Sequence, residues 1–234
     1  MKLQIIIIAG GLATRLGTLT SNKPKSLIDI NGDPFIIHQL RYLKNQGFKK
    51  IHLCLGFLAD QIITTLKHFN YLDLNITYSL DGDNQLGTGG ALKNALDKCE
   101  DYFFVQYGDS YLPINYSKIY DFFVMNKSQS NILTIYENNS MYDKSNVIYT
   151  ANKIFKYDKN LNSAEMNFID YGLSLLKKDE IIPILGNNIS DLSEVYKILI
   201  NENKMIPYIV KERFYEIGKP EGIADMKKYI ERLP

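Results

Sequence analysis

A glycine-rich loop near the start of the chain carries residue types suited to binding phosphate. Gly10 and Gly11 follow an apolar run, and the cations Arg15 and Lys25 come soon after them. Adjacent glycines let the backbone approach a ligand closely and leave amide donors free for phosphate oxygens. The planar guanidinium of Arg15 suits a polyphosphate, and Lys25 supplies a second positive charge. The loop is neither a Walker A loop nor a dinucleotide-binding glycine turn, but it predicts phosphate binding.

A second glycine cluster is predicted to open a helix, as at a nucleotide pocket. It comprises Gly87, Thr88 and the two glycines that follow, and backbone amides at a helix start favour anionic ligands. Asp81 comes directly after the preceding apolar run. A carboxylate can accept hydrogen bonds from N1–H and the exocyclic amine of guanine, whereas uracil and thymine offer only one such donor. Asp81, or the neighbouring Asp83, therefore has the chemistry to recognise guanine.

Acidic side chains supply a third candidate feature. Asp109 comes just after the apolar run 102–107, which we predict to be a buried strand. A carboxylate at the carboxyl end of a parallel strand is well placed to hold Mg²⁺. The sequence therefore predicts a magnesium ligand at Asp109.

The elements that must position these residues alternate between strands and helices. Apolar, β-branched runs predict strands at 3–9, 51–55, 76–80 and 102–107, with helices at 34–46, 58–68 and 89–98. Alternation at this spacing predicts right-handed βαβ units and a doubly wound α/β sheet that is mostly parallel. Ligands of such sheets bind beyond the carboxyl ends of the strands, so the loops after Ala9, Leu80 and Tyr107 should share one crevice.

The second half of the chain is less regular and predicts a small antiparallel portion in a mixed sheet. The expected helices are 116–125, 191–200 and 221–232, and the expected strands are 132–136, 147–149, 154–157, 168–176, 205–210 and 214–217. We expect one domain over residues 1–234, whose two halves meet at about residue 112.

The first of these motifs resembles the signature of the sugar-1-phosphate nucleotidyltransferases, also called NDP-sugar pyrophosphorylases. Their pattern is Gly-Gly-x-Gly-Thr-Arg-Leu, then Pro-Lys-Pro-Leu, then Gly-x-Pro. In this chain Ala13 replaces a glycine and Ser26 replaces a proline. The matching positions are Gly10, Gly11, Thr14, Arg15, Leu16, Pro24, Lys25, Leu27, Gly32 and Pro34.

The resemblance implies a Rossmann-like nucleotidyltransferase fold, with a nucleotide-binding half at about 1–112 and a sugar-phosphate-binding half at about 113–234. Asp81 matches the family position that reads the base edge, which favours GTP. The resemblance also implies a set of site residues. Glu216 stands where the family has a second metal-binding aspartate, so Asp109 and Glu216 are the expected Mg²⁺ ligands. The expected catalytic residues are Arg15, Lys25 and Asp109. The expected nucleotide-binding residues are Ala9, Gly10, Gly11, Arg15, Lys25, Asp81, Gly87 and Thr88. The expected sugar-phosphate-binding residues are Tyr111, Asn146, Lys159, Asp170 and Gly172.

The implied reaction joins an NTP and a sugar 1-phosphate into an NDP-sugar and pyrophosphate by Mg²⁺-assisted in-line displacement. The heptose 1-phosphate guanylyltransferases are the most similar subgroup, which implies GTP, a heptose 1-phosphate and a surface polysaccharide precursor. One alternative is a UTP- or CTP-dependent enzyme acting on N-acetylmuramate 1-phosphate or a phosphocholine-like acceptor. Another is a catalytically silent regulatory homologue.

Composition excludes several other classes of function. The formal net charge of +1 gives no electrostatic reason for a nucleic-acid partner. The two cysteines and three histidines show no zinc-ligand spacing. Without a signal peptide or a membrane-spanning stretch, we expect a cytoplasmic protein with no membrane partner. The sequence leaves the oligomeric state open, a homodimer included.

Overall fold

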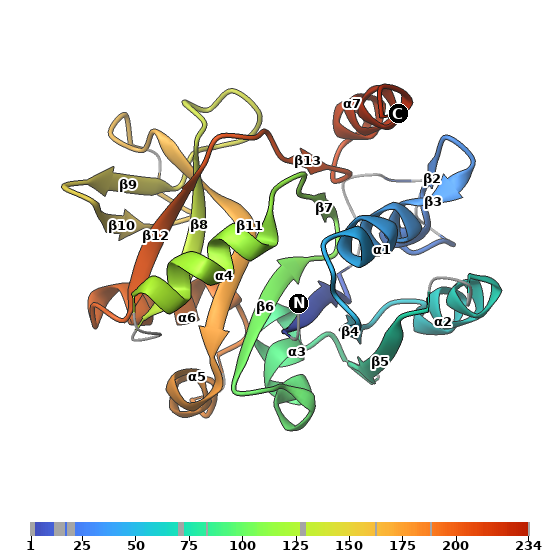
Figure 1. Ribbon diagram of the computed structural model, residues 1–234, viewed down its shortest axis with the longest axis horizontal. Helices are drawn as coiled ribbons and strands as arrows, with labels where there is room; N and C mark the ends of the chain where they lie inside the picture. The colour runs from blue at the N-terminus through green and yellow to red at the C-terminus, as the bar shows by residue number, and fades with distance from the viewer. Residues whose placement is uncertain are drawn as a thin grey trace.

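The computed structural model describes residues 3–11, 17, 22–69, 73–82, 84–126, 130–161, 163–187 and 189–233. Its main sheet runs in the order β10-β9-β11-β6-β1-β4-β5 (Figure 1). Off this path, β8 pairs with β11, and β12 pairs with β8. None of the helices in the described residues is both long and apolar enough to cross a membrane.

Parallel strands form the centre of this sheet, as the apolar runs predict. β1 pairs in parallel with β4 on one side and β6 on the other, and β5 follows β4 in parallel at the edge. The strands are β1 (Gln4–Ala9), β4 (Lys50–Leu55), β5 (Asn75–Leu80) and β6 (Tyr102–Tyr107). The β-branched run in β1 is buried on both faces, because Ile5 and Ile7 contact one core cluster and Ile6 and Ile8 contact the other.

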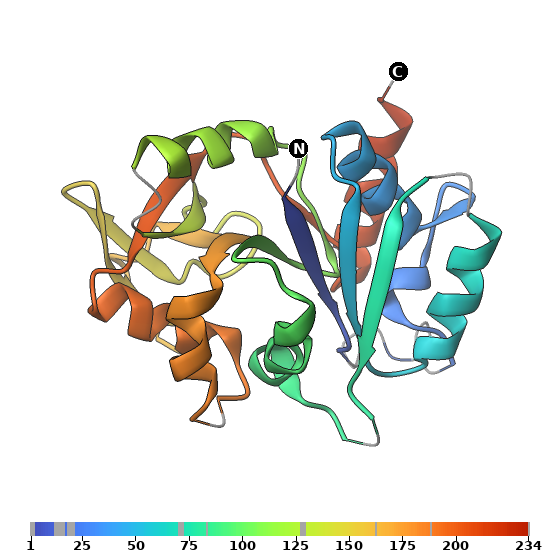
Figure 2. The same cartoon turned by 60° about the horizontal axis from the view of Figure 1, so that its bottom comes forward.

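Helices cover both faces of the sheet. Residues of α1, α2 and α4 belong to one core cluster, and residues of α3, α5 and α6 belong to the other; Figure 2 shows α4 and α3 on opposite sides of the strands. The helices are α1 (Phe35–Asn45), α2 (Ala59–His68), α3 (Gly87–Ala95), α4 (Tyr116–Met125), α5 (Lys178–Leu185), α6 (Leu192–Asn201) and α7 (Pro220–Glu231). Short 3-10 turns, η2 (Lys25–Leu27) and η4 (Leu96–Lys98), complete the helical elements.

The second half of the chain supplies the antiparallel portion that we predicted. β11 pairs antiparallel with β6 and β8, β9 and β10 form a hairpin, and β12 returns parallel to β8. These strands are β8 (Asn131–Glu137), β9 (Val147–Thr150), β10 (Lys153–Tyr157), β11 (Phe168–Lys177) and β12 (Met205–Val210).

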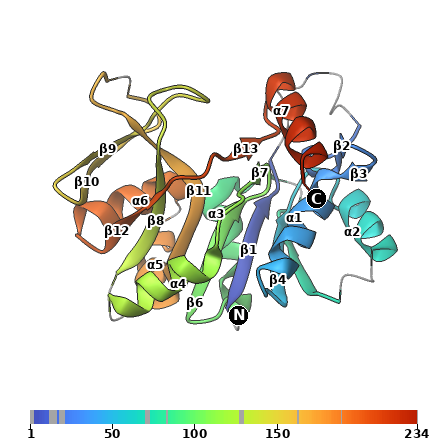
Figure 3. The same ribbon diagram turned by 45° about the horizontal axis from the view of Figure 1, so that its top comes forward.

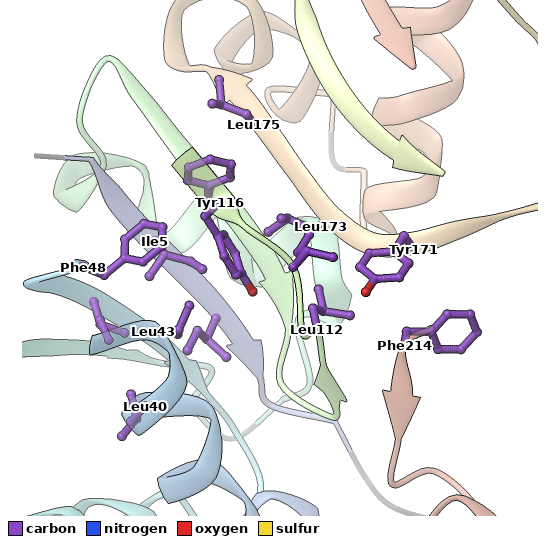
Figure 4. Packing of buried hydrophobic residues seen from close by; sticks show 14 of the residues in the cluster. Ile5, Leu40, Leu43, Phe48, Leu112, Tyr116, Tyr171, Leu173, Leu175 and Phe214 are labelled. Atoms are coloured by element: carbon purple, nitrogen blue, oxygen red, sulfur yellow. The ribbon is translucent and has the colours of Figure 1, made fainter. Parts of the chain in front are cut away.

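A continuous apolar core links the two halves. In Figure 4, Phe48 and Tyr116 lie beside β1, and Leu173, Tyr171 and Phe214 continue the packing toward the end of the chain. The rings of Phe48 and Tyr116 meet edge to face with centroids 5.3 Å apart. This packing holds β6 in place between its parallel neighbour β1 and its antiparallel neighbour β11.

Three short strands and one helix were not predicted. The strands are β2 (Asp29–Ile30), β3 (Asp33–Pro34) and β7 (Ser110–Tyr111), and the helix is α5. β2 pairs with β3, and β7 pairs with β13 (Tyr215–Glu216), which lies within the predicted strand 214–217. Helix α5 forms although Pro183 lies inside it. Figure 3 shows β13 beside β7, with α7 continuing over α1. The β7–β13 pair therefore carries the end of the chain back to the carboxyl end of β6.

Candidate active site

A narrow cleft lies at the carboxyl ends of β1 and β6. Its volume is about 140 Å³, and Ala9, Gly11 and Thr88 of the predicted nucleotide site line it. The lining residues are Ile8, Ala9, Gly11, Lys25, Ser26, Thr88, Tyr107, Gly108 and Asp109. The loops after Ala9 and Tyr107 therefore share a cleft, as predicted, whereas no described residue of the third loop, directly after Leu80, lines it.

Close backbone packing explains the glycines at this edge of the sheet. A Cβ atom on Gly108 would lie 2.6 Å from Cβ of Ala9, and one on Gly10 would lie 2.8 Å from Oδ2 of Asp81. Neither position has room for a side chain, so the ends of β1, β4 and β6 can approach each other and the Asp81 carboxylate. Burial raises the pKa of Asp81, and a hydrogen bond with the Leu86 backbone opposes that shift.

The start of α3 is held against the start of α6. Gly87 has a φ of +71°, and a Cβ atom there would overlap the carbonyl oxygen of Ser190. The Thr88 hydroxyl accepts a hydrogen bond from the Leu192 amide at 2.8 Å and lies 3.4 Å from Oδ1 of Asp191. Thr88 thus caps α6 while it also lines the narrow cleft.

Lys25 and Asp109 meet in an ion pair at the mouth of the cleft. Lys25 Nζ donates to Asp109 Oδ2 at 2.8 Å, and the two side chains are 22% and 36% exposed. Lys25 begins the 3-10 turn η2 directly after Pro24. Asp109 follows β6. Lys25, a predicted phosphate-binding residue, and Asp109, a predicted metal ligand, therefore lie side by side, as expected.

Glu216 lies beside this pair because of the β7–β13 pairing. The register sets Glu216 against Ser110, and the Ile217 amide donates to the Asp109 carbonyl oxygen at 3.0 Å. Burial, followed by the nearby charges of Asp109 and Asp143, raises the pKa of Glu216 to about 8, and Lys25 opposes this rise. Two carboxylates therefore share one poorly solvated corner with a single lysine beside them.

A larger cavity of about 480 Å³ opens on the other side of the ion pair. Lys25 and Asp109 belong to both linings, so the two spaces meet at this pair. The larger cavity is lined by Lys25, Asp109, Met141, Tyr142, Asp143, Arg213, Phe214, Glu216, Gly218, Lys219, Glu221, Gly222 and Asp225. Its described lining carries five carboxylates and three cations, which can hydrogen-bond the hydroxyl groups of a polar ligand.

Several cavity residues were missed in the sequence. Lys219 donates to Asp143 at 3.2 Å, which joins the loop after β8 to the start of α7. Arg213 stacks on the rings of Tyr142 and Tyr215 and pairs with Asp225. Lys219 follows the predicted metal ligand Glu216 by three residues, so it could have been found from that prediction. Asp143 and Arg213 stand in segments that carry no motif.

Four of the predicted sugar-phosphate residues cluster around Tyr107 rather than in the larger cavity. Lys159 Nζ lies 3.5 Å from the Tyr107 hydroxyl and 3.6 Å from Oδ1 of Asp191. Asp170 accepts hydrogen bonds from the Tyr157 hydroxyl and the Gly172 amide, each at 3.0 Å.

Asn146 completes this cluster by holding Asp170. Its Oδ1 accepts from the Asp170 amide at 2.9 Å. Burial raises the pKa of Asp170, and the Lys159 charge opposes that shift. Lys159 lines neither cavity itself and is connected to the narrow cleft through Tyr107, which lines that cleft.

Tyr111 does not reach either cavity. It is 3% exposed and packs with Ile30, Phe35, Ile217 and Met226. Its ring lies 5.2 Å from that of Tyr42, measured between centroids. The expectation that Tyr111 bonds a sugar hydroxyl is therefore corrected: strand β7 turns this side chain into an apolar cluster. Arg15 and Asp83 lie outside the described residues, so their roles stay predictions.

Comparison with known proteins assigns the family. The profile of the nucleotidyl transferase family matches residues 4–145, which is more than half of the chain. The chain belongs to the nucleotidyl transferase family. This membership makes it an enzyme of the nucleotidyltransferase class, as the resemblance implied.

The nucleotidyltransferase is similar to curated guanylyltransferases. It is 29% identical over 226 residues to the D-glycero-alpha-D-manno-heptose 1-phosphate guanylyltransferase of Campylobacter jejuni, covering 94% of this chain and 96% of that protein. It is also 29% identical over 222 residues to the mannose-1-phosphate guanyltransferase of Saccharomyces cerevisiae. That match covers 92% of this chain but only 61% of the yeast protein.

Solved structures confirm the predicted fold class. HddC from Yersinia pseudotuberculosis complexed with GMP-PN has a TM-score of 0.81 and 25% identity, covering 97% of this chain and 99% of that one. A UDP-glucose pyrophosphorylase complexed with UDP-glucose has a TM-score of 0.81 at 17% identity, covering 99% of each chain. The second likeness concerns the fold alone.

The donor set of the nucleotidyltransferase fits a divalent cation. Asp109 and Glu216 supply carboxylate oxygens at one corner, where burial and then repulsion from the charge of Asp109 raise the pKa of Glu216. A bound cation would relieve that repulsion. No group of three or more acidic, histidine or cysteine side chains in the described part of the chain is arranged to hold a metal. The pair would therefore need oxygen ligands from substrate or water as well.

Proposed function

We propose that this nucleotidyltransferase transfers a guanylyl group from GTP to a sugar 1-phosphate, with a heptose 1-phosphate as the first candidate acceptor. The products are a GDP-sugar and pyrophosphate. A GDP-sugar is an activated glycosyl donor, which suits the synthesis of surface polysaccharide precursors.

The observation that carries the proposal is the position of Lys25 and Asp109 between two spaces. Direct transfer requires the α-phosphorus of the nucleotide and the acceptor phosphate to meet at one point. The narrow cleft beside the glycine loop suits the nucleotide phosphate, and the larger polar cavity suits the sugar. The ion pair stands where the two ligands would touch.

The choice of guanine is supported by Asp81 and by the relatives. The Asp81 carboxylate lies against Gly10 and Gly56 at the end of β5, close to the phosphate loop. In its ionised form it can accept both hydrogen bonds that the edge of guanine donates. The similar proteins from Campylobacter and yeast are both named for guanylyl transfer.

The proposed mechanism is an in-line displacement without a general base. A phosphate oxygen of the acceptor, already an anion, attacks the α-phosphorus, and pyrophosphate leaves with the electron pair of the broken P–O bond. Lys25 neutralises charge at the α-phosphorus and Arg15 holds the leaving pyrophosphate. Lys159, beside Tyr107 at the narrow cleft, orients the acceptor phosphate where it meets the nucleotide. The protein contributes position and charge rather than proton transfer.

Asp109 and Glu216 would hold Mg²⁺. When bound, the ion would supply positive charge to the phosphate oxygens at the point of transfer. The ordinary preference of Mg²⁺ for oxygen ligands agrees with this pair of carboxylates. Glutamate in place of aspartate keeps the oxygen donor and lengthens the side chain by one methylene group.

A panel of the four NTPs with heptose, mannose and amino-sugar 1-phosphates tests the proposal. Pyrophosphate release measures turnover, with phosphocholine as an additional acceptor. We expect the highest kcat/KM for GTP with heptose 1-phosphate. Preference for UTP or CTP would contradict the guanylyl assignment, and nucleotide binding without pyrophosphate release in any pair would indicate a silent homologue.

A further inference from the structure

Ser26 is a buried serine with an unused hydroxyl. It follows Lys25 in turn η2 and is 4% exposed. Its Oγ makes no hydrogen bond with any described residue. Leaving a buried hydroxyl without a partner destabilises a folded protein, so such atoms are rare and call for an explanation. A ligand that binds beside Ser26 would provide one.

The other hydroxyl groups around the narrow cleft already have partners. Thr88 accepts from the Leu192 amide, and the Tyr107 hydroxyl lies within reach of Lys159 Nζ. Lys25 Nζ donates to Asp109. Ser26 lines the same cleft. It differs from these neighbours because no side chain or backbone group in the described residues satisfies it.

The chemistry of the cleft selects a phosphate as the missing partner. Ionised phosphate oxygens only accept hydrogen bonds, and a hydroxyl can donate one. The cation of Lys25 is adjacent, and the cleft begins at the glycine loop. The pattern that this loop resembles has proline at the position of Ser26, and proline offers no such donor.

We infer that the Ser26 hydroxyl donates a hydrogen bond to a phosphate oxygen of the bound nucleotide. This inference rests on the proposed function, because it requires an NTP in the narrow cleft. Ser26 then binds the nucleotide through its phosphate and makes no contribution to recognition of the base. Its hydroxyl is unpaired only until the nucleotide binds.

Calorimetric binding of GTP, GMP and guanosine to four proteins tests the inference. The proteins are the wild type, Ser26→Ala, Ser26→Thr and the control Ser174→Ala. We expect Ser26→Ala to weaken GTP and GMP binding by about tenfold, the loss typical of one hydrogen bond to a charged group. Guanosine binding should not change, and Ser26→Thr should restore the affinity for GTP because it keeps the hydroxyl.

The control variant separates binding from folding. Ser174 is fully buried, and its hydroxyl pairs with that of Tyr196 at 2.8 Å. Ser174→Ala should lower Tm and leave nucleotide affinity unchanged. Ser26→Ala should leave the Tm of the ligand-free protein unchanged or raise it, because it removes a hydroxyl that has no partner among the described residues.

Three results would overturn the inference: wild-type affinity for GTP in Ser26→Ala, an equal loss for guanosine, or a fall in Tm as large as that of Ser174→Ala. A wild-type protein that binds GTP while Ser26→Ala binds it equally well contradicts the role of Ser26 alone. A wild-type protein that binds none of the four NTPs contradicts the proposed function as well.

Discussion

Replacement of Lys25 by alanine should remove most of the turnover and leave the fold intact. Lys25 Nζ lies 2.8 Å from Asp109 Oδ2, where the two cavities meet. In the proposed transition state its charge faces the α-phosphate. For unit charges about 4 Å apart at an effective dielectric constant of about 20, the interaction is about 4 kcal/mol. Such a loss corresponds to a fall in kcat of about 10²–10³-fold.

The effect on stability should be much smaller. The Lys25 and Asp109 side chains are 22% and 36% exposed, so solvent screens their attraction and the pair contributes at most about 1 kcal/mol to folding. In a chain of this length that corresponds to a shift in Tm of less than about 4 °C. Steady-state pyrophosphate release gives kcat, and thermal unfolding gives Tm for the same preparations.

A matched lysine provides the control. Lys177 donates to Glu180 at 2.6 Å, and both side chains are mostly buried. This pair lies outside both cavity linings. Lys177→Ala should therefore cost some stability with no loss of kcat. If Lys25→Ala keeps more than a tenth of the wild-type kcat, or if Lys177→Ala loses as much activity, the role assigned to Lys25 is wrong.

Three further predictions concern other parts of the molecule. Gly87→Ala should lower Tm and weaken GTP binding, because the added Cβ overlaps the Ser190 carbonyl and strains a φ of +71°; unchanged thermal unfolding and affinity would contradict this packing. Tyr111→Phe should leave the KM for the sugar 1-phosphate unchanged, because the ring lies in an apolar cluster; a several-fold rise in KM would return Tyr111 to the acceptor site. Burial, followed by the charge of Lys98, lowers the pKa of His52 in the folded protein. As the pH falls, His52 is therefore protonated first in the unfolded state, and the free energy of unfolding should fall below about pH 6.5. Denaturant unfolding between pH 7 and pH 5 should show a weaker pH dependence in His52→Gln, and equal slopes would refute the assignment.

The parallel half of the fold could be predicted because its strands are long apolar runs. β1 and β6 are buried on both faces, so apolar residues do not alternate with polar ones along them and each strand stands out as an apolar run in the sequence. The carboxyl ends of parallel strands lie at one edge of the sheet. The proximity of Lys25 and Asp109 could therefore be predicted from the order of the strands and the glycine-rich motif.

The shortest elements could not all be found in this way. β7 has two residues, too few for any periodicity, and its pairing with β13, which lies within the predicted strand 214–217, depends on distant packing. The burial of Tyr111 follows from that pairing and was therefore missed. Pro183 argues against a helix by local propensity, yet packing of Ile181 and Leu185 on the core stabilises α5.

The central claim is that the chain transfers a nucleotidyl group to a sugar 1-phosphate at Lys25 and Asp109. Parallel reactions with GTP labelled at the α- or γ-phosphorus, with heptose 1-phosphate and Mg²⁺, test it most directly. We predict that the α label appears in the GDP-sugar and the γ label in pyrophosphate, and that Asp109→Asn abolishes both. Transfer of the γ label to the acceptor, or full activity in Asp109→Asn, would contradict the claim.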